Sequence, residues 1–179
     1  MIRFLARLYP IIARARGILI PAFSSHVHAT RLTVGPSARL HTSMGGRISA
    51  GPDCAVESRA LLHAEKGSIT LGRDVFIGTG TIIVAREDIT IGDDTLIAEY
   101  VTIRDQDHEM SSNTVKRSAG FRTSPISIGR NVWIGAKCSI LKGVTIGDDS
   151  VIAANAVVSR DVPARTVAAG IPARVIRSL

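Results

Sequence analysis

The sequence predicts an all-β protein, a parallel β-helix, and three observations lead to this expectation. Within each of several groups, an aliphatic or alanine side chain returns every six residues. The residue two positions earlier is usually β-branched or small, and a glycine often follows. The aliphatic positions are Val34 and Leu40; Ala50, Val56 and Leu62; Leu71, Ile77 and Ile83; Ile91, Ile97 and Ile103; Ile128, Ile134 and Ile140; and Ile146, Ile152 and Val158. Helices repeat at three and four and a lone strand at two, whereas a sustained period of six is typical of a β-helix.

Each group of three hexads predicts one coil of eighteen residues, and the longer steps between groups predict insertions at coil boundaries. Because residues i and i−2 of a strand face the same side, Thr81, Thr95 and Val101 are expected to share the interior with the aliphatic residues. The Gly, Asp and Asn residues that follow the strands are expected to form the corners, since they tolerate turn conformations. An antiparallel sandwich fits less well, because sandwich strands vary in length and register.

The composition agrees with a single domain that has a thin core. The 179 residues are 45% hydrophobic but only 4% aromatic, and a narrow prism has little room for rings. Cys54 and Cys138 both stand two positions before an aliphatic residue. We expect them to be small buried side chains, without a disulfide or a zinc spacing, in a reducing cytoplasmic compartment.

The first 30 residues differ from the repeat. Between residues 2 and 12 apolar side chains fall on one helical face, with arginines interspersed. Charges interrupt this run too often for a transmembrane helix, the uncharged stretch from Leu8 to Ala13 is too short for the apolar region of a secretory signal, and Pro10 would bend or split a helix. We expect residues 1–30 to be an amphipathic cap on the open end of a solenoid formed by residues 31–179, because a cap covers exposed strand edges. Peripheral contact of residues 1–20 with the inner face of an anionic membrane is the alternative, and both roles are compatible.

The formal net charge of +7 and the pI of about 10.2 indicate a basic surface. Such a surface suits nucleic acid, a membrane or a phosphorylated ligand. The sequence lacks the recognition helix, aromatic stacking platform and zinc knuckle of nucleic-acid modules, so a nucleic-acid partner is not expected. A phosphorylated ligand is favoured instead.

The repeat is interrupted once on a large scale. Ile103 and Ile128 are 25 positions apart where the repeat predicts six, so residues 104–127 are expected to form a polar projecting loop. Long loops on rigid scaffolds often carry catalytic groups. His108 stands near the loop root and is the candidate general base, although an exposed loop histidine without a catalytic role fits its position equally well.

Three segments carry a resemblance to one family. They are the Asp-Gln-Asp-His run at 105–108, the Ile-Gly-Arg-Asn-Val-Trp-Ile-Gly run at 128–135, and the ending from Val158 to Arg177 with Ala-Gly-Ile-Pro-Ala at 169–173. Together with the hexads they resemble the left-handed β-helix (hexapeptide-repeat) acyltransferases, and over residues 65–179 the chain is most similar to galactoside, maltose and polysaccharide O-acetyltransferases. The resemblance implies a left-handed coil and a homotrimer whose active sites lie between neighbouring prisms.

The resemblance also implies acetyl-CoA as the co-substrate and no metal. By motif match, Trp133 would flank the pantetheine or thioester end, and backbone groups near Ala136 and Ala154 would bind the pantetheine amides. The residues expected at the nucleotide and phosphate end are Ser159, Arg160, Arg174 and Arg177. Arginine suits phosphate oxygens, although a solvated basic tail accounts equally well for Arg177.

The implied reaction is transfer of acetyl to a sugar hydroxyl, in surface polysaccharide or glycan biosynthesis, with His108 as the general base. An acidic residue would orient the imidazole, and Asp105, Asp107 and Glu109 are the open alternatives. An N-acetyltransferase acting on an amino sugar or a nucleotide-linked amino sugar is the second reading, because the same base and co-substrate serve an amine. A zinc hydratase on this fold needs three converging histidines, and no histidine follows His108.

One departure from the family concerns the acceptor. Gly80 or Thr81 stands where the sugar acetyltransferases of this family carry an Asn, and Ala85-Arg86-Glu87 replaces an acidic pair common in galactoside enzymes. These differences argue against a simple galactoside or maltose acceptor. A basic surface around Arg86 would suit an anionic, nucleotide-linked or lipid-linked glycan.

Overall fold

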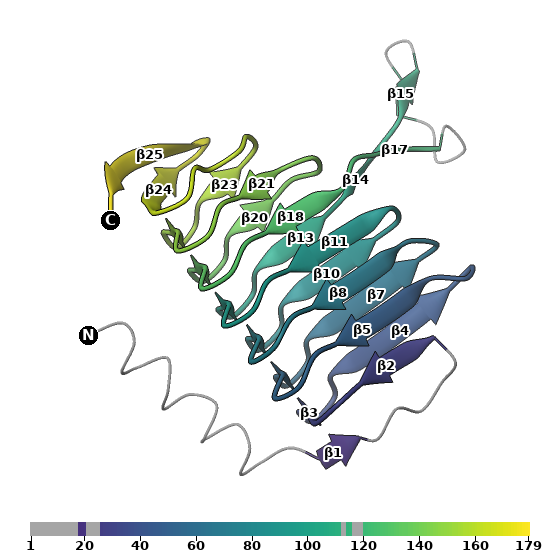
Figure 1. Ribbon diagram of the computed structural model, residues 1–179. Helices are drawn as coiled ribbons and strands as arrows, with labels where there is room; N and C mark the ends of the chain where they lie inside the picture. The colour runs from purple at the N-terminus through teal and green to yellow at the C-terminus, as the bar shows by residue number, and fades with distance from the viewer. Residues whose placement is uncertain (1–17, 21–25, 112–113, 116–119) are drawn as a thin grey trace.

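The computed structural model describes residues 18–20, 26–111, 114–115 and 120–179. In these ranges the chain forms the left-handed parallel β-helix that the sequence predicts (Figure 1). Each coil gives one strand to each of three sheets, so the neighbours in a sheet come from successive coils and pair in parallel. The three sheets are the faces of a prism, which we call faces A, B and C.

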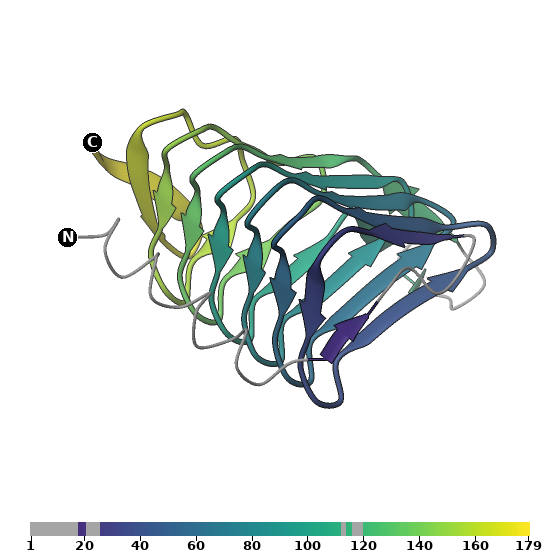
Figure 2. The ribbon, with the colours of Figure 1, turned by 60° about the horizontal axis from the view of Figure 1, so that its bottom comes forward.

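The chain passes from face B to face A and then to face C in each coil. Face A consists of β1 (Ile18–Ile20), β3 (Leu32–Val34), β6 (Ala55–Val56), β9 (Phe76–Ile77), β12 (Leu96–Ile97), β19 (Trp133–Ile134), β22 (Val151–Ile152), β24 (Thr166–Gly170) and β25 (Ala173–Ser178). Face B consists of β2 (Val27–Ala29), β5 (Arg47–Ala50), β8 (Ser68–Leu71), β11 (Asp88–Ile91), β18 (Ile126–Ile128) and β21 (Thr145–Ile146). Face C consists of β4 (Arg39–Ser43), β7 (Leu61–Glu65), β10 (Ile82–Ala85), β13 (Thr102–Arg104), β20 (Ser139–Ile140) and β23 (Val157–Val158). Figure 2 shows the coils stacked from the purple N-terminal end to the yellow C-terminal end.

The aliphatic residues of the hexads form the core, as predicted. All of them are buried except Leu40, which is partly buried. They stack in register from coil to coil: on face A, Ile97 pairs with Ile134, which pairs with Ile152. Each such side chain contributes about 1.5–3 kcal/mol by leaving water, so these inward ladders supply most of the driving force for folding.

The residues two positions before the aliphatic ones also lie inside, as predicted. Thr81, Thr95 and Ser150 have no exposed surface. Each hydroxyl donates a hydrogen bond to a backbone carbonyl of the next coil, at 2.8 Å from Thr81 to Ala98 and 2.9 Å from Thr95 to Gly129. The interior polar groups are therefore satisfied, which a buried hydroxyl requires.

The two cysteines are free and buried, as predicted. The Sγ of Cys54 donates to the carbonyl of Gly72 at 3.0 Å, and that of Cys138 donates to the carbonyl of Ala153 at 3.0 Å. Burial raises the pKa of Cys54 to about 11 and also raises the pKa of Cys138. Both residues are thus protonated packing groups at neutral pH.

The corners use glycine for a different reason from the one that the sequence suggested. Positive φ angles fall on the following Asp or Asn, such as 59° at Asp94 and 52° at Asn131, and not on the glycine directly after the aliphatic residue. At Gly92 an added Cβ would lie 2.7 Å from the backbone carbon of Gly129 in the next coil. Glycine is required there because successive coils approach too closely for any side chain.

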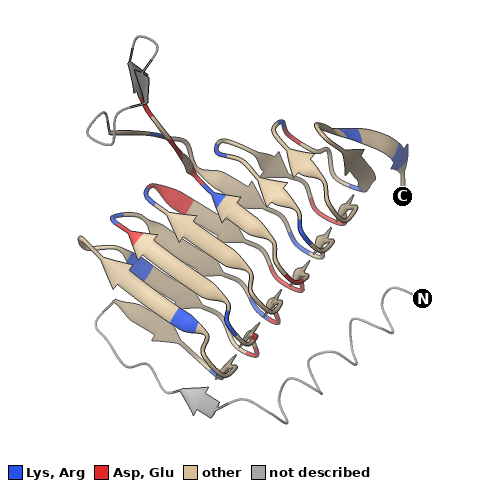
Figure 3. Ribbon diagram, turned by 180° about the vertical axis from the view of Figure 1, so that it is seen from behind, with Lys and Arg blue, Asp and Glu red and all other residues tan. Residues whose placement is uncertain are grey.

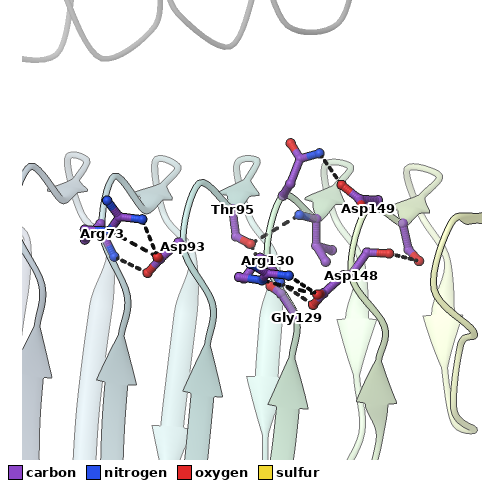
Figure 4. A network of polar contacts seen from close by, with 10 residues as sticks. Arg73, Asp93, Thr95, Gly129, Arg130, Asp148 and Asp149 are labelled. Atoms are coloured by element: carbon purple, nitrogen blue, oxygen red, sulfur yellow. Dashed lines mark hydrogen bonds and ion pairs between the residues drawn. The ribbon is translucent and has the colours of Figure 1, made fainter.

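The edge between faces B and A carries a ladder of charged pairs (Figure 4). Asp93 accepts hydrogen bonds from the backbone N–H of Arg73 at 2.8 Å and from its guanidinium at 2.8 Å. Asp148 does the same for Arg130, at 2.8 and 2.9 Å. The backbone hydrogen bond first, and then the arginine side chain, hold the pKa values of Asp93 and Asp148 below their usual range. Each carboxylate thereby joins its coil to the preceding one.

The predicted loop at 104–127 leaves the prism at the edge between faces C and B. It contains two antiparallel strand pairs, β14 (Gln106–His108) with β17 (Phe121–Thr123) and β15 (Met110–Ser111) with β16 (Thr114–Val115). The pair β14–β17 extends away from the coils (Figure 1). The loop is therefore an ordered hairpin at its root.

Asp105 anchors this root. Its side chain is fully buried, and its carboxylate accepts hydrogen bonds from the backbone N–H groups of Arg86 at 2.9 Å and Glu87 at 2.8 Å. Its own carbonyl accepts from the N–H of Ser124 at 2.9 Å. Burial raises the pKa of Asp105. A carboxylate held by backbone donors of the previous coil ties the hairpin to the wall of the prism.

The two ends of the chain differ from the middle. β1 pairs antiparallel with β3, and the coils begin at Val27, four residues before the predicted boundary. The predicted helical cap and its membrane contact fall largely on residues 1–17 and 21–25, outside the described residues. At the other end β25 pairs antiparallel with β24, so the predicted C-terminal tail is an ordered strand of face A.

Charged residues lie mostly at the turns, and the strands that form the faces are largely uncharged (Figure 3). Among the described residues, none of the elements is a helix long and apolar enough to cross a membrane.

The charged ladder predicts an acid-dependent loss of stability. A carboxylate whose pKa is lowered in the folded state stabilises above its unfolded pKa, and this contribution disappears as the pH falls through the folded pKa. We expect the thermal midpoint of the wild-type protein to drop between about pH 5 and about pH 2 more than that of the variant Asp93→Asn/Asp148→Asn. Scanning calorimetry across this pH range measures the difference. If the thermal midpoints of the wild-type protein and the variant fall equally with pH, the stabilising role of the two carboxylates is contradicted.

The anchoring role of Asp105 predicts a large effect of truncation. Asp105→Ala leaves the N–H groups of Arg86 and Glu87 without their buried acceptor and should lower the free energy of unfolding by about 2–5 kcal/mol. Asp105→Asn keeps one acceptor oxygen and should cost less than half as much. Urea unfolding followed by circular dichroism measures both changes. An unchanged urea midpoint for Asp105→Ala would contradict the anchoring role of Asp105.

Candidate active site

His108 is the last residue of β14 and is exposed, at the foot of the hairpin. The antiparallel register places it opposite Phe121 of β17. The two ring centroids are 4.3 Å apart, with the planes tilted by 36°. The candidate base is thus presented to solvent and packed on one side by an aromatic ring.

The three acidic residues that the sequence offered as partners of His108 are engaged elsewhere. Asp105 is buried and accepts from the backbone of the previous coil. Asp107 forms an ion pair of 3.5 Å with Lys142, and Glu109 forms one of 3.4 Å with Arg122. In the single chain the three carboxylates therefore serve to fix the hairpin.

Arg86 and Phe121 are the residues near His108 that the sequence reasoning missed in this role. The guanidinium carbon of Arg86 lies 3.5 Å from the centroid of the Phe121 ring. The same guanidinium is paired with the carboxylate of Glu65, and the Nε–Oε2 distance is 3.0 Å. The side chain of Arg86 is only 21% exposed, so it does not form the open basic surface for an anionic acceptor that the sequence suggested.

The structure also shows where Gly80 and Thr81 lie, the two residues that stand where the sugar acetyltransferases carry an Asn. Thr81 is buried and its hydroxyl binds the carbonyl of Ala98, so it faces the core. Gly80 occupies the corner between faces A and C with a φ of 68°. An acceptor-binding side chain is therefore missing at these two positions.

Several of the predicted cofactor residues share the outer side of face A. Residues directly opposite each other in neighbouring strands point to the same side. Trp133 pairs with Val151, Val151 pairs with Val167, and Val167 pairs with Arg177. Arg174 stands nearby on the same strand, opposite Ala169. An indole that is 41% exposed and two arginines thus lie along one end of face A.

Ala136 and Ala154 occupy the edge between faces A and C in successive coils. The N–H of Asn155 donates to the carbonyl of Ala136 at 2.9 Å, which holds the two corners one above the other. Ser159 and Arg160 directly follow β23 of face C and so lead into the edge between faces C and B. The predicted cofactor set is therefore divided between two regions of the prism.

One chain does not bring His108 to the residues of face A. The hairpin with His108 leaves the edge between faces C and B, and in a three-sided prism this edge lies opposite face A (Figure 1). Ser159 and Arg160 are on the side of His108, whereas Trp133, Arg174 and Arg177 are on the far side.

In the described part of the chain, no group of three or more His, Cys, Asp or Glu side chains could hold a metal ion. The chemistry available at the described surface is that of an imidazole base, an exposed indole, and arginines suited to phosphate.

Comparison with known proteins identifies the family. Residues 125–160 match the bacterial transferase hexapeptide family. Galactoside O-acetyltransferase from Escherichia coli K12 is 42% identical over 112 residues, which are 63% of this chain and 55% of that protein. The chain thus spans little more than half of that relative's length.

Two further proteins match over most of their length. A putative acetyltransferase from Schizosaccharomyces pombe is 31% identical over 162 residues, which are 79% of this chain and 77% of that protein. A hexapeptide-repeat acetyltransferase from Vibrio cholerae, solved in complex with acetyl-CoA, is 29% identical with a TM-score of 0.59, over 86% of this chain and 70% of that chain. With the repeat, the fold and these matches, the chain belongs to the hexapeptide-repeat transferase family.

Proposed function

We propose that the protein is an acetyl-CoA-dependent O-acetyltransferase that acts on a sugar hydroxyl, with His108 as its general base. The observation that carries the proposal is an exposed imidazole at the root of the hairpin that projects from the coils of a hexapeptide-repeat fold. The likeness to the E. coli galactoside O-acetyltransferase supports a sugar hydroxyl as acceptor. The cysteine thiols are buried and have raised pKa values, so they do not offer a nucleophile for a covalent route.

In the proposed chemistry His108 relays one proton from the acceptor hydroxyl to the departing sulfur. Neutral imidazole accepts the proton of the acceptor hydroxyl while that oxygen attacks the thioester carbonyl of the donor. The C–S bond then breaks, and the departing sulfur takes up the proton. Backbone N–H groups near the site would stabilise the negative charge that develops on the carbonyl oxygen.

Acetyl-CoA is elongated, with phosphates at one end and a thioester at the other, and face A offers a matching sequence of groups. Strands are spaced by about 4.8 Å, so the outward column from Trp133 to Arg177 spans roughly 14 Å. We propose that Trp133 contacts the pantetheine end and that Arg174 and Arg177 bind phosphate oxygens. The corner residues Ala136 and Ala154 would bind the pantetheine amides through their backbone groups.

We further propose that the active unit is a homotrimer. The edge with His108, Ser159 and Arg160 of one chain would lie against face A of the next. This contact joins two different surfaces, and such a heterologous contact closes into a ring when it repeats by a threefold rotation. Each site would then take its base from one subunit and its indole from the neighbour.

The acceptor is proposed as a sugar of a surface polysaccharide or another glycan. The engagement of Arg86 with Glu65 leaves its charge neutralised, so an anionic group on the acceptor has no support at that position. An amino sugar remains the alternative acceptor, since the same base would take up the proton that the amine nitrogen loses when it adds to the thioester carbonyl.

The assignment of the base predicts a large loss of turnover. His108→Ala should lower kcat by about two to four orders of magnitude, while acetyl-CoA still raises the thermal midpoint of the protein. Release of CoA thiol is measured with a panel of galactosides, nucleotide sugars and lipid-linked glycans. His28→Ala, which removes an exposed histidine from face B, is the matched control and should retain wild-type turnover. Wild-type turnover in His108→Ala with every acceptor that the wild-type protein acetylates would refute the role.

The shared site predicts complementation between subunits. His108→Ala and Trp133→Ala/Arg177→Ala should each be nearly inactive at low acetyl-CoA. Co-expression should restore activity, because about one quarter of the sites in randomly mixed trimers would combine two intact halves. Light scattering on the same preparation should give the mass of three chains. A monomer mass in an active preparation, or no gain on mixing, would contradict the shared site.

A further inference from the structure

The Phe121 ring packs against the imidazole of His108, and the guanidinium of Arg86 packs against that ring, whereas an acidic residue was expected beside the imidazole. Resting on the proposed function, we propose that Phe121 and Arg86 are positioning residues, which set the orientation of His108 for proton transfer. Neither residue needs to touch the substrate in this role. The argument runs from the ring of His108 back to the wall of the prism.

The first link is the contact between His108 and Phe121. Register partners on β14 and β17 place the two rings side by side, at 4.3 Å between centroids and 36° between planes. Close, offset ring pairs are favourable, and the flat face of Phe121 restricts rotation of the imidazole about its side-chain bonds. An exposed histidine without such a neighbour would sample several rotamers.

The second link is the contact between Phe121 and Arg86. The guanidinium carbon lies 3.5 Å from the ring centroid, well within the range of a cation–π interaction. Phe121 stands in a hairpin that projects from the coils, whereas Arg86 directly follows β10 of the prism. The contact therefore fixes the hairpin ring to the rigid scaffold.

Arg86 is itself held at both ends. Its backbone N–H donates to the buried carboxylate of Asp105 at 2.9 Å. Its guanidinium donates to both oxygens of Glu65, which is at the end of β7 in the coil before. The two side chains are 21% and 23% exposed, so solvent screens this pair less than it screens a fully exposed one. Two neighbouring coils thus set the position of the guanidinium.

The contacts of Phe121 and Arg86 matter because His108 lies in the projecting hairpin and needs a restraint on its position. A general base must stay within hydrogen-bond reach of the proton that it accepts, and small displacements of catalytic groups cost large factors in rate. His108 belongs to a hairpin outside the repeating coils, so the β-helix itself does not fix it. Asp105, Asp107 and Glu109 are committed to Arg86 and Glu87, to Lys142 and to Arg122 respectively. The ring and the guanidinium supply the restraint instead.

The test separates positioning from stability. Phe121→Leu removes the flat ring but keeps an apolar side chain, and we expect kcat to fall about 10- to 100-fold with the KM for acetyl-CoA within about twofold. Phe121→Tyr keeps the ring and should retain kcat within about threefold. Arg86→Gln should lower kcat about three- to tenfold, in keeping with the loss of one cation–π contact. The double variant should be no slower than Phe121→Leu, because both residues act through the same ring.

Arg122→Gln is the matched control. It removes the ion pair with Glu109 in the same hairpin; because these two side chains are 68% and 43% exposed, the pair restrains the hairpin only weakly and its loss should leave kcat unchanged. A readout independent of turnover is the proton NMR spectrum of the imidazole. The Phe121 ring current should displace the His108 resonances in the wild-type protein and in Phe121→Tyr, and the displacement should vanish in Phe121→Leu.

The outcomes distinguish this inference from the proposed function. Wild-type kcat in Phe121→Leu, together with an inactive His108→Ala, would overturn the positioning role and leave the base in place. Wild-type kcat in His108→Ala would overturn both. If Phe121→Leu does not fold, Arg86→Gln and the NMR spectrum of the wild-type protein decide, and undisplaced imidazole resonances would refute the stacked geometry.

Discussion

The structure depends on one constraint: successive coils must pair in parallel register at the spacing of β-strands. Ile97, Ile134 and Ile152 stand directly above one another because each coil repeats the path of the coil before. The same closeness explains why a Cβ at Gly92 would lie 2.7 Å from the backbone of Gly129. Core composition, interior hydroxyls and corner residues all follow from this repeat, since a side chain that does not fit in one coil would also displace the coils above and below it.

The repeat also explains how the chain carries a long insertion without disturbing its scaffold. Ile91 before the hairpin pairs with Ile128 after it, and Ile103 pairs with Ile140. The hairpin leaves and rejoins at one edge, so the pairing of the coils continues across the insertion. Loop closure costs little more for a long loop than for a short one, and this scaffold can therefore present side chains such as His108 outside its regular surface.

The sequence predicted those features that depend on the period and left out those that depend on contacts across it. The hexads, the interior Thr95 and the buried Cys54 follow from spacing alone, and the structure confirms them. The contact of Arg86 with Phe121 could not be predicted from the sequence, because it joins a coil to a hairpin whose register no periodicity encodes. The role of corner glycines was misread for a related reason: turn preference is a local property, whereas the approach of the next coil is not.

The division of the candidate site follows from the same geometry. A prism of constant cross-section presents its three faces and edges over its whole length, and the residues of one face cannot reach the opposite edge. His108 at one edge and Trp133 on the face opposite do not meet in one subunit; in the homotrimer that we propose, His108 of one subunit would lie near Trp133 of the next. Because successive coils repeat the same path, a contact made at one level of the proposed homotrimer would be repeated along the axis, and a long groove would lie between subunits. Under the proposed function, acetyl-CoA would lie in this groove with its phosphates near the arginines of β25 and its reacting end near the hairpin. His108 belongs to the hairpin outside the repeating coils, and the root of this hairpin is the point at which Arg86 and Asp105 fasten it to the wall of the prism.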